Sequence, residues 1–168
     1  MSMIGKFFQV TDNELEEYLA NSLLFEKRID AEDSDEGSNV CDIDKSWDAL
    51  SFLLTGFGPS ELKKAEAPLS WVIFGAQILD ENQDLGYGPA GYLTSDQVSD
   101  LNNALNRIPI SQLKENYDPA KMNELGIYPN FWENNEDEID YLINHFIKLK
   151  EFYKISSLNG QAVITYLS

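Results

Sequence analysis

The sequence holds a single cysteine, Cys41, and a single histidine, His145, among its 168 residues. One cysteine excludes an intramolecular disulfide, and one histidine beside one cysteine is too few for the usual zinc sites. A lone thiol fits a reducing compartment, so we expect a cytoplasmic protein. No apolar run approaches the roughly 18 residues of a membrane helix, and the opening MSMIGKFFQV lacks the features of a signal peptide.

Signature motifs of catalysis and cofactor binding are also scarce. The letters GYGPAG at residues 86–91 match G-x-G-x-x-G. However, Pro89 removes one amide from such a cradle, and the next helix is expected only after Thr94. An EF-hand alignment from Asp80 places Leu85 where the calcium loop requires glycine. A Cys41–His145 nucleophile pair has no local signature to support it. We therefore expect no marked catalytic residue, no metal and no cofactor.

Basic residues are few: 12 lysines and arginines stand against 29 acids, for a formal net charge of −17. Such a field repels nucleic acid and anionic membranes, so neither is expected as a partner. The surplus acids either keep the protein soluble or favour a basic partner protein.

Hydrophobic residues make up 43% of the chain, enough for a compact core over residues 1–168 as one domain. Residues 3–10 and 161–167 are rich in β-branched and aromatic residues and predict strands at both ends. Capping boxes at Thr11/Glu14 and Thr94/Gln97 predict two helix starts. The expected fold is α+β: a small sheet that includes the N- and C-terminal strands, covered by several amphipathic helices.

Other segments give weaker patterns. Residues 30–39 are dominated by acids and predict a mobile loop, whereas residues 136–154 predict the longest helix. Residues 42–56 predict a helix that Asp42 or Asp44 could cap. Residues 71–79 fit a strand or a helix, and residues 80–91 predict a loop.

The most suggestive polar group starts the 42–56 segment. Asp42, Asp44, Lys45 and Asp48 could bind a cation or perform acid–base chemistry, or they could serve as helix-start acids with a surface ion pair. Aromatic residues could add a pocket wall or belong to the core. The tentative binding residues are Asp42, Asp44, Lys45, Trp47, Asp48, Tyr92, Tyr128 and Trp132.

The segment DIDKSWDALSFLLTG at residues 42–56 resembles the signature of the YfbM-like family of small bacterial proteins, a domain of unknown function. MIGKF near the start, GYLTSDQV and MNELGIYP agree in the same order, so the resemblance covers nearly the whole chain. It implies a stand-alone bacterial protein with an α+β fold, and it supplies no catalytic residues.

Two functions from different classes remain open. The first is a non-catalytic binding protein, such as an acidic inhibitor or immunity-type protein that masks a basic partner. The second is an enzyme or small-ligand-binding protein that uses the Asp42/Asp44/Lys45/Asp48 cluster beside an aromatic pocket. The second hypothesis requires the acids of residues 42–48 and the aromatics of residues 127–132 to share a cavity.

Overall fold

The structure is a computed structural model that describes residues 2–32 and 39–168. Its regular elements follow in chain order: β1 Gly5–Val10, α1 Asp12–Ala20, α2 Leu23–Glu32, β2 Val40–Asp42, the 3-10 helix η1 Asp44–Ser46, α3 Trp47–Thr55, η2 Pro59–Lys64, η3 Leu69–Trp71, β3 Gln77–Ile78, β4 Gly91–Leu93, α4 Ser95–Asn106, α5 Ile110–Asn116, α6 Pro119–Glu124, α7 Glu136–Leu158 and β5 Ala162–Leu167.

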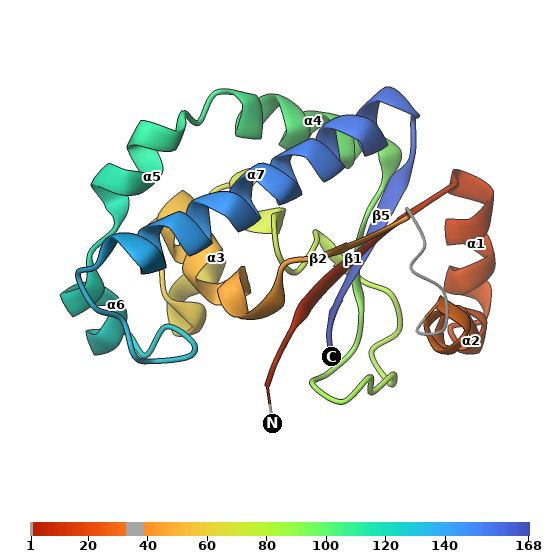
Figure 1. Ribbon diagram of the computed structural model, residues 1–168. Coiled ribbons are helices and arrows are strands. Elements are labelled where there is room, and N and C mark those ends of the chain that lie inside the picture. Colours follow the sequence, from red (N-terminus) through yellow and green to blue (C-terminus); the bar gives the residue numbers. More distant parts are fainter. Residues whose placement is uncertain (1, 33–38) are drawn as a thin grey trace.

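The strands form one antiparallel sheet in the order β2-β1-β5-β4-β3. The two terminal strands pair with each other along their whole length, from Gly5 opposite Leu167 to Val10 opposite Ala162. The predicted α+β fold with both terminal strands in the sheet is therefore confirmed, and Figure 1 shows β1 and β5 side by side at the centre of the molecule.

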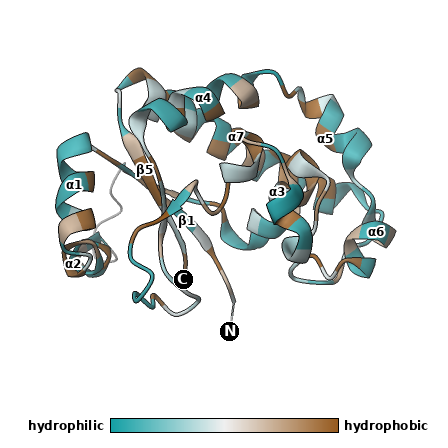
Figure 2. Cartoon of the chain, turned by 180° about the vertical axis from the view of Figure 1, so that it is seen from behind, coloured by the Kyte–Doolittle hydropathy of each residue, from teal (hydrophilic) through white to brown (hydrophobic). Residues whose placement is uncertain are grey.

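Helices cover both faces of this sheet (Figure 1). Because side chains alternate along a strand, Phe7 and Val163 enter a large core under α3, α4 and α7, whereas Phe8 and Ile164 enter a smaller core under α1 and α2. Figure 2 shows hydrophobic colour on the strands and on the inner sides of α3 and α7, and hydrophilic colour on outward surfaces. The long helix α7 packs along the larger core and contributes several of its buried side chains.

Both predicted capping boxes are present. Thr11 Oγ1 accepts from Glu14 N, and Thr94 Oγ1 accepts from Gln97 N, while each Glu or Gln side chain returns a bond to the cap backbone. The helix α6 begins in a similar way, since Asp118 Oδ1 accepts from Lys121 N at 3.0 Å. Local polar chemistry therefore fixes these three helix starts.

The expectation of an uninterrupted helix capped by Asp42 or Asp44 was wrong. Asp42 ends strand β2, and its Oδ1 accepts from Asp44 N at 2.7 Å. Asp44 then has a left-handed backbone with φ of 50°, and α3 begins only at Trp47. The chain needs this sharp bend because β2 pairs with β1 while α3 packs beneath the sheet.

Residues 71–79 form neither a full strand nor a full helix: a 3-10 turn ends at Trp71, and within this segment Gln77–Ile78 forms a strand. Residues 80–90 form the expected loop. As expected, the GYGPAG segment does not lie at a helix N-terminus, because it leads into strand β4 at Gly91. β4 was not anticipated, and it gains its backbone partners from β5 and β3.

The predicted acidic loop at residues 30–39 is partly helical: α2 extends through Glu32. Residues 33–38 lie outside the described part of the chain, so the expected mobility is not addressed there. Helix α5 was not anticipated, and α7 continues beyond residue 154 to Leu158. Within the described ranges, no helix combines the length and the apolar character needed to span a membrane.

Candidate functional site

A surface groove of about 410 Å³ lies between η1, the segment before α7, and the first turns of α7. We call it the Phe131 groove, because the Phe131 side chain is 82% exposed at its edge. Its lining residues are Asp44, Lys45, Pro129, Phe131, Trp132, Asn135, Asp137, Glu138 and Tyr141. The groove therefore combines carboxylates, aromatic rings and one ammonium group.

Trp132 anchors the segment that carries Phe131. Its indole is buried, and Nε1 donates to the Ile127 carbonyl at 2.9 Å. The Asn123 side chain holds the Trp132 backbone from both sides, accepting from its N–H at 2.9 Å and donating to its carbonyl at 2.8 Å. With its neighbour fixed in this way, the Phe131 ring is presented to solvent by a supported backbone.

Trp47 and Tyr128 lie behind the groove and do not line it. Their rings stack with centroids 5.5 Å apart and an interplanar angle of 22°. Trp47 Nε1 donates to the Met3 carbonyl at 3.0 Å, and Met3 N donates to the Tyr128 hydroxyl at 3.1 Å. These two aromatics tie the start of the chain to the base of the groove segment.

Asp48 is also behind the groove, where it is 4% exposed. Its Oδ2 accepts from Tyr128 N at 2.8 Å. Burial raises the pKa of Asp48 above its ordinary value of 3.8, and the bond from Tyr128 opposes that shift only in part. Asp48 thus holds the backbone before Pro129, although its burial disfavours the charged form of the carboxylate.

The burial of the Asp48 carboxylate should affect how the free energy of unfolding depends on pH, and replacement by asparagine should reveal this effect. A carboxyl whose pKa is raised on folding stabilises the folded state below about pH 3.8, and that contribution is lost as pH rises toward the folded-state pKa. Asp48→Asn keeps an oxygen acceptor for Tyr128 N and carries no charge. We therefore expect its free energy of unfolding, relative to wild type, to increase from pH 4 to pH 7.

Urea denaturation at several pH values measures this difference, with Asp48→Ala as the matched variant. Alanine leaves Tyr128 N without its acceptor and should cost about 1–3 kcal/mol at pH 7. A pH-independent difference between Asp48→Asn and wild type would contradict the assignment.

Two groove carboxylates are each fixed by a tyrosine. Tyr141 Oη donates to Asp44 Oδ2 at 2.8 Å. Tyr117 Oη lies 2.8 Å from Glu138 Oε2 and 2.6 Å from the Glu133 carbonyl oxygen, so its one proton is shared between these two acceptors. Glu133 N adds a second bond to the same Glu138 oxygen at 2.7 Å. Burial, and then the carboxylate that each hydroxyl contacts, raise the pKa of Tyr141 and of Tyr117. Both hydroxyls therefore stay protonated donors at neutral pH.

Asp42 and Lys45, the other charged residues of the predicted cluster, have different positions and roles. The Asp42 carboxylate bonds the Asp44 backbone, and its carbonyl accepts from Lys148 Nζ at 2.6 Å, so Asp42 serves the bend before η1. Lys45 lines the Phe131 groove and is the only cation among the groove's nine lining residues. Three carboxylates against one ammonium leave the groove with a negative formal charge.

Tyr92 does not reach the groove. It lies on β4 opposite Ile164, so its side chain faces the smaller core under α1 and α2. Of the tentative binding residues, the structure therefore brings Asp44, Lys45 and Trp132 into one groove. The other four do not line the groove but contact the residues beside it. Asp42 bonds the Asp44 backbone, Asp48 bonds the Tyr128 backbone, and Trp47 stacks on Tyr128.

Cys41 and His145 do not form an activated nucleophile. Cys41 is buried, and burial raises the pKa of its thiol to about 12, which keeps the sulfur protonated. His145 packs edge-on against Tyr141 with ring centroids 4.6 Å apart. Burial lowers the pKa of His145, and the nearby Asp44 opposes that shift. A search of residues 2–32 and 39–168 finds no cluster of three potential metal ligands.

Sequence reasoning missed Phe131, Tyr117, Glu138 and Tyr141. The aromatic residues of positions 127–132 were predicted as a possible pocket wall. No feature of the neighbouring sequence indicates that Phe131 is exposed while Trp132 is buried. The bond from Tyr141 to Asp44 joins residues 97 positions apart, and the bond from Tyr117 to Glu138 joins residues 21 positions apart. Both bonds depend on the packing of α7, which no motif records.

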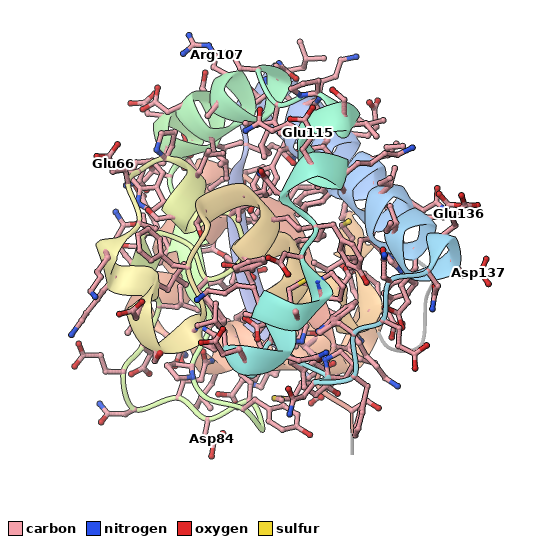
Figure 3. All side chains as sticks on the ribbon, turned by 90° about the vertical axis from the view of Figure 1, so that its left-hand side faces the viewer. Glu66, Asp84, Arg107, Glu115, Glu136 and Asp137 are labelled. Atoms are coloured by element: carbon pink, nitrogen blue, oxygen red, sulfur yellow. The ribbon has the colours of Figure 1, made fainter. Side chains whose placement is uncertain are left out.

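A second hollow, of about 440 Å³, lies between α4 and the segment around η3. Asp100, Asn103 and Arg107 line one side of it, and Pro68 and Trp71 line the other. Figure 3 shows Arg107 projecting outward at the rim. Asp100, Asn103 and Arg107 occupy exposed positions on α4 or directly after it. Within residues 2–32 and 39–168, their side chains form no hydrogen bond or ion pair like those of Asp44 and Glu138. The Phe131 groove is therefore the better-built candidate.

The fold and the groove define a class of small α+β domain whose candidate site is an open, acidic surface groove. Residues 1–166 match the family described as "Domain of unknown function (DUF1877)". The chain belongs to this family.

Protein YfbM of Escherichia coli strain K12 is similar to the chain, with 28% identity over 131 residues that cover 77% of the chain and 74% of YfbM. The crystal structure of YfbM from Escherichia coli, a protein of unknown function, is similar in fold, with a TM-score of 0.70 and 25% identity. The match covers 99% of this chain and all of that one. The family resemblance of the sequence is thereby confirmed.

Proposed function

We propose that the chain is a non-catalytic binding protein that docks a basic partner protein at the Phe131 groove, in the manner of an acidic inhibitor or immunity-type protein. The observation that carries the proposal is an 82% exposed phenylalanine beside carboxylates that tyrosines hold in place. Aromatic side chains are enriched at protein-binding surfaces, and a negative charge around one favours a partner of opposite charge.

Charge supports this proposal at two levels. The whole chain carries −17, which would steer a basic partner toward it from a distance and raise the association rate at low salt. Glu136 and Asp137 project outward from the first turn of α7 (Figure 3). Asp137 lines the groove, and Glu136 extends the negative surface beyond it.

Preorganisation would add affinity. Asp44 and Glu138 are each held through one oxygen, so a partner's cation need not pay the full entropy of ordering them. The Phe131 backbone is likewise fixed by the bonds around Trp132. Such a surface changes little on binding, as in other preorganised complexes.

The enzyme alternative has less support. Asp44 and Lys45 do share the groove with Trp132, as that hypothesis requires. However, Asp48 lies behind the groove, Asp42 serves the bend, and the Cys41 thiol stays protonated. Of the groove carboxylates, Asp44 and Glu138 are held by hydroxyl donors, an arrangement that suits recognition of a cation better than proton transfer.

A comparison of two variants tests the proposal. The groove variant carries Phe131→Ser, Asp44→Asn, Asp137→Asn and Glu138→Gln. The control carries Glu16→Gln, Glu17→Gln and Glu115→Gln, which remove the same number of charges from exposed sites on α1 and α5. Immobilised wild type and control should retain the same basic protein from a bacterial extract at low salt and release it as salt rises.

The captured protein is then purified, and its affinity for each variant is measured. We expect the groove variant to lose about 2 kcal/mol or more of binding free energy, since hot-spot and charged contacts are removed together. Equal losses in the groove variant and in the control would show a general charge effect and would overturn docking at this groove. Circular dichroism melts confirm that both variants are folded.

A further inference from the structure

The two fixed carboxylates of the Phe131 groove each keep one oxygen available. Asp44 Oδ2 is engaged by Tyr141, and Glu138 Oε2 is engaged by Tyr117 and by Glu133 N. In the described part of the chain, Asp44 Oδ1 and Glu138 Oε1 form no hydrogen bond. The groove is thus lined by two carboxylates, from η1 and from the first turn of α7, that are each held through one oxygen and keep a second acceptor.

The Phe131 ring is also available. It is 82% exposed, and it forms no ring contact or cation–π contact with the part of the chain that the structure describes. Pro129 and Trp132 line the groove beside it, so a group that enters the groove lies near the aromatic ring and near both carboxylates. The site therefore suits a flat cation with several donors.

We propose that the basic partner anchors itself with an arginine side chain, whose guanidinium stacks on Phe131 and donates to Asp44 Oδ1 and Glu138 Oε1. This inference rests on the proposed function and names the chemistry of its anchor. A guanidinium is planar, is weakly hydrated, stacks on aromatic rings and carries five donors in a fixed fork. A lysine ammonium is a compact, strongly hydrated charge that cannot stack in this way.

The groove's own cation does not occupy this place. Lys45 lines the groove, yet its ammonium forms no ion pair with Asp44, Asp137 or Glu138. The acceptor oxygens are therefore open to a donor from a partner.

Three blocked five-residue glycine peptides test the inference, with a central arginine, lysine or citrulline. Citrulline keeps the planar shape and removes the charge. NMR titration of the full chain should show the arginine peptide binding on the order of tenfold more tightly than the lysine peptide, with the largest shifts at the groove residues 44–45 and 129–141. The citrulline peptide should bind more weakly than both.

Two single variants identify the contacts. Phe131→Leu keeps an apolar side chain and removes the ring, and it should reduce the preference for arginine over lysine to about twofold or less. Asp44→Asn should weaken the arginine peptide on the order of tenfold, whereas Glu115→Gln, on α5 (Figure 3), should leave it unchanged.

Equal binding of the arginine and lysine peptides would overturn the arginine anchor, and so would shifts that lie away from residues 44–45 and 129–141. That result leaves the basic partner at the groove intact, because the comparison of groove and control variants above tests it separately. Failure of that comparison with a clear arginine preference here would instead reject the partner protein and keep the arginine-binding groove.

Discussion

Replacing Trp132 with alanine is expected to lower the free energy of unfolding by about 3–5 kcal/mol, the usual cost of deleting a large buried aromatic side chain. The indole is only 6% exposed, so its removal opens a cavity in the larger core. It also leaves the Ile127 carbonyl without the Nε1–H donor that bonds it at 2.9 Å. The segment that carries Phe131 would lose its main anchor at the same time.

Urea denaturation of Trp132→Ala measures this loss, and the neighbouring residue supplies the control. Phe131→Ala removes an aromatic ring of similar size from a position 82% exposed, so we expect a change within about 0.5 kcal/mol. The two variants together separate a structural aromatic from a surface one. Equal stabilities for the two would show that the burial assigned to Trp132 is wrong.

Gly91→Ala is expected to destabilise the protein by about 3 kcal/mol or more, because overpacked cores must shift their backbone to relieve a clash. A Cβ on Gly91 would stand 1.8 Å from the Phe74 carbonyl oxygen and 2.8 Å from the carbon of that carbonyl. Both atoms belong to the backbone, so no side-chain rotation relieves the contact. Gly91 pairs with Thr165 of β5 and Ile78 of β3, and a shift there would disturb both ladders.

Gly86→Ala is the matched control for this prediction. Gly86 has a φ of 108° and nothing within 4 Å of an added Cβ, so its replacement costs only backbone strain, about 1–2 kcal/mol. Thermal or urea unfolding of both variants measures the difference. A Gly91→Ala protein as stable as Gly86→Ala would contradict the close approach of the segment at Phe74 to β4.

The parts of the fold that sequence could predict are those governed by local chemistry. Thr11 with Glu14 and Thr94 with Gln97 specify helix starts through bonds within four residues, and both boxes are present. The apolar strands at the two ends are likewise marked by their own composition. Strand β4 escaped prediction because its three residues follow a glycine-rich loop and become a strand only through pairing with β5.

The candidate site was predictable only in part, for the same physical reason. Asp44, Lys45 and Trp132 were singled out by residue type, and they do meet in one groove. Trp47 and Tyr128 were singled out too, but they stack on each other behind it, because aromatic rings gain more from burial than from exposure. Phe131 could not be distinguished from Trp132 without knowing that Asn123 fixes the Trp132 backbone.

The central claim is that a basic protein docks at the Phe131 groove, and its most direct test is the affinity of the purified partner for the two charge-matched variants at rising salt. We predict that wild type and the Glu16/Glu17/Glu115 control bind with similar affinity and similar loss on adding salt. The groove variant should bind on the order of thirtyfold more weakly, the ratio that corresponds to about 2 kcal/mol. Equal affinity of all three proteins for the partner would contradict the claim.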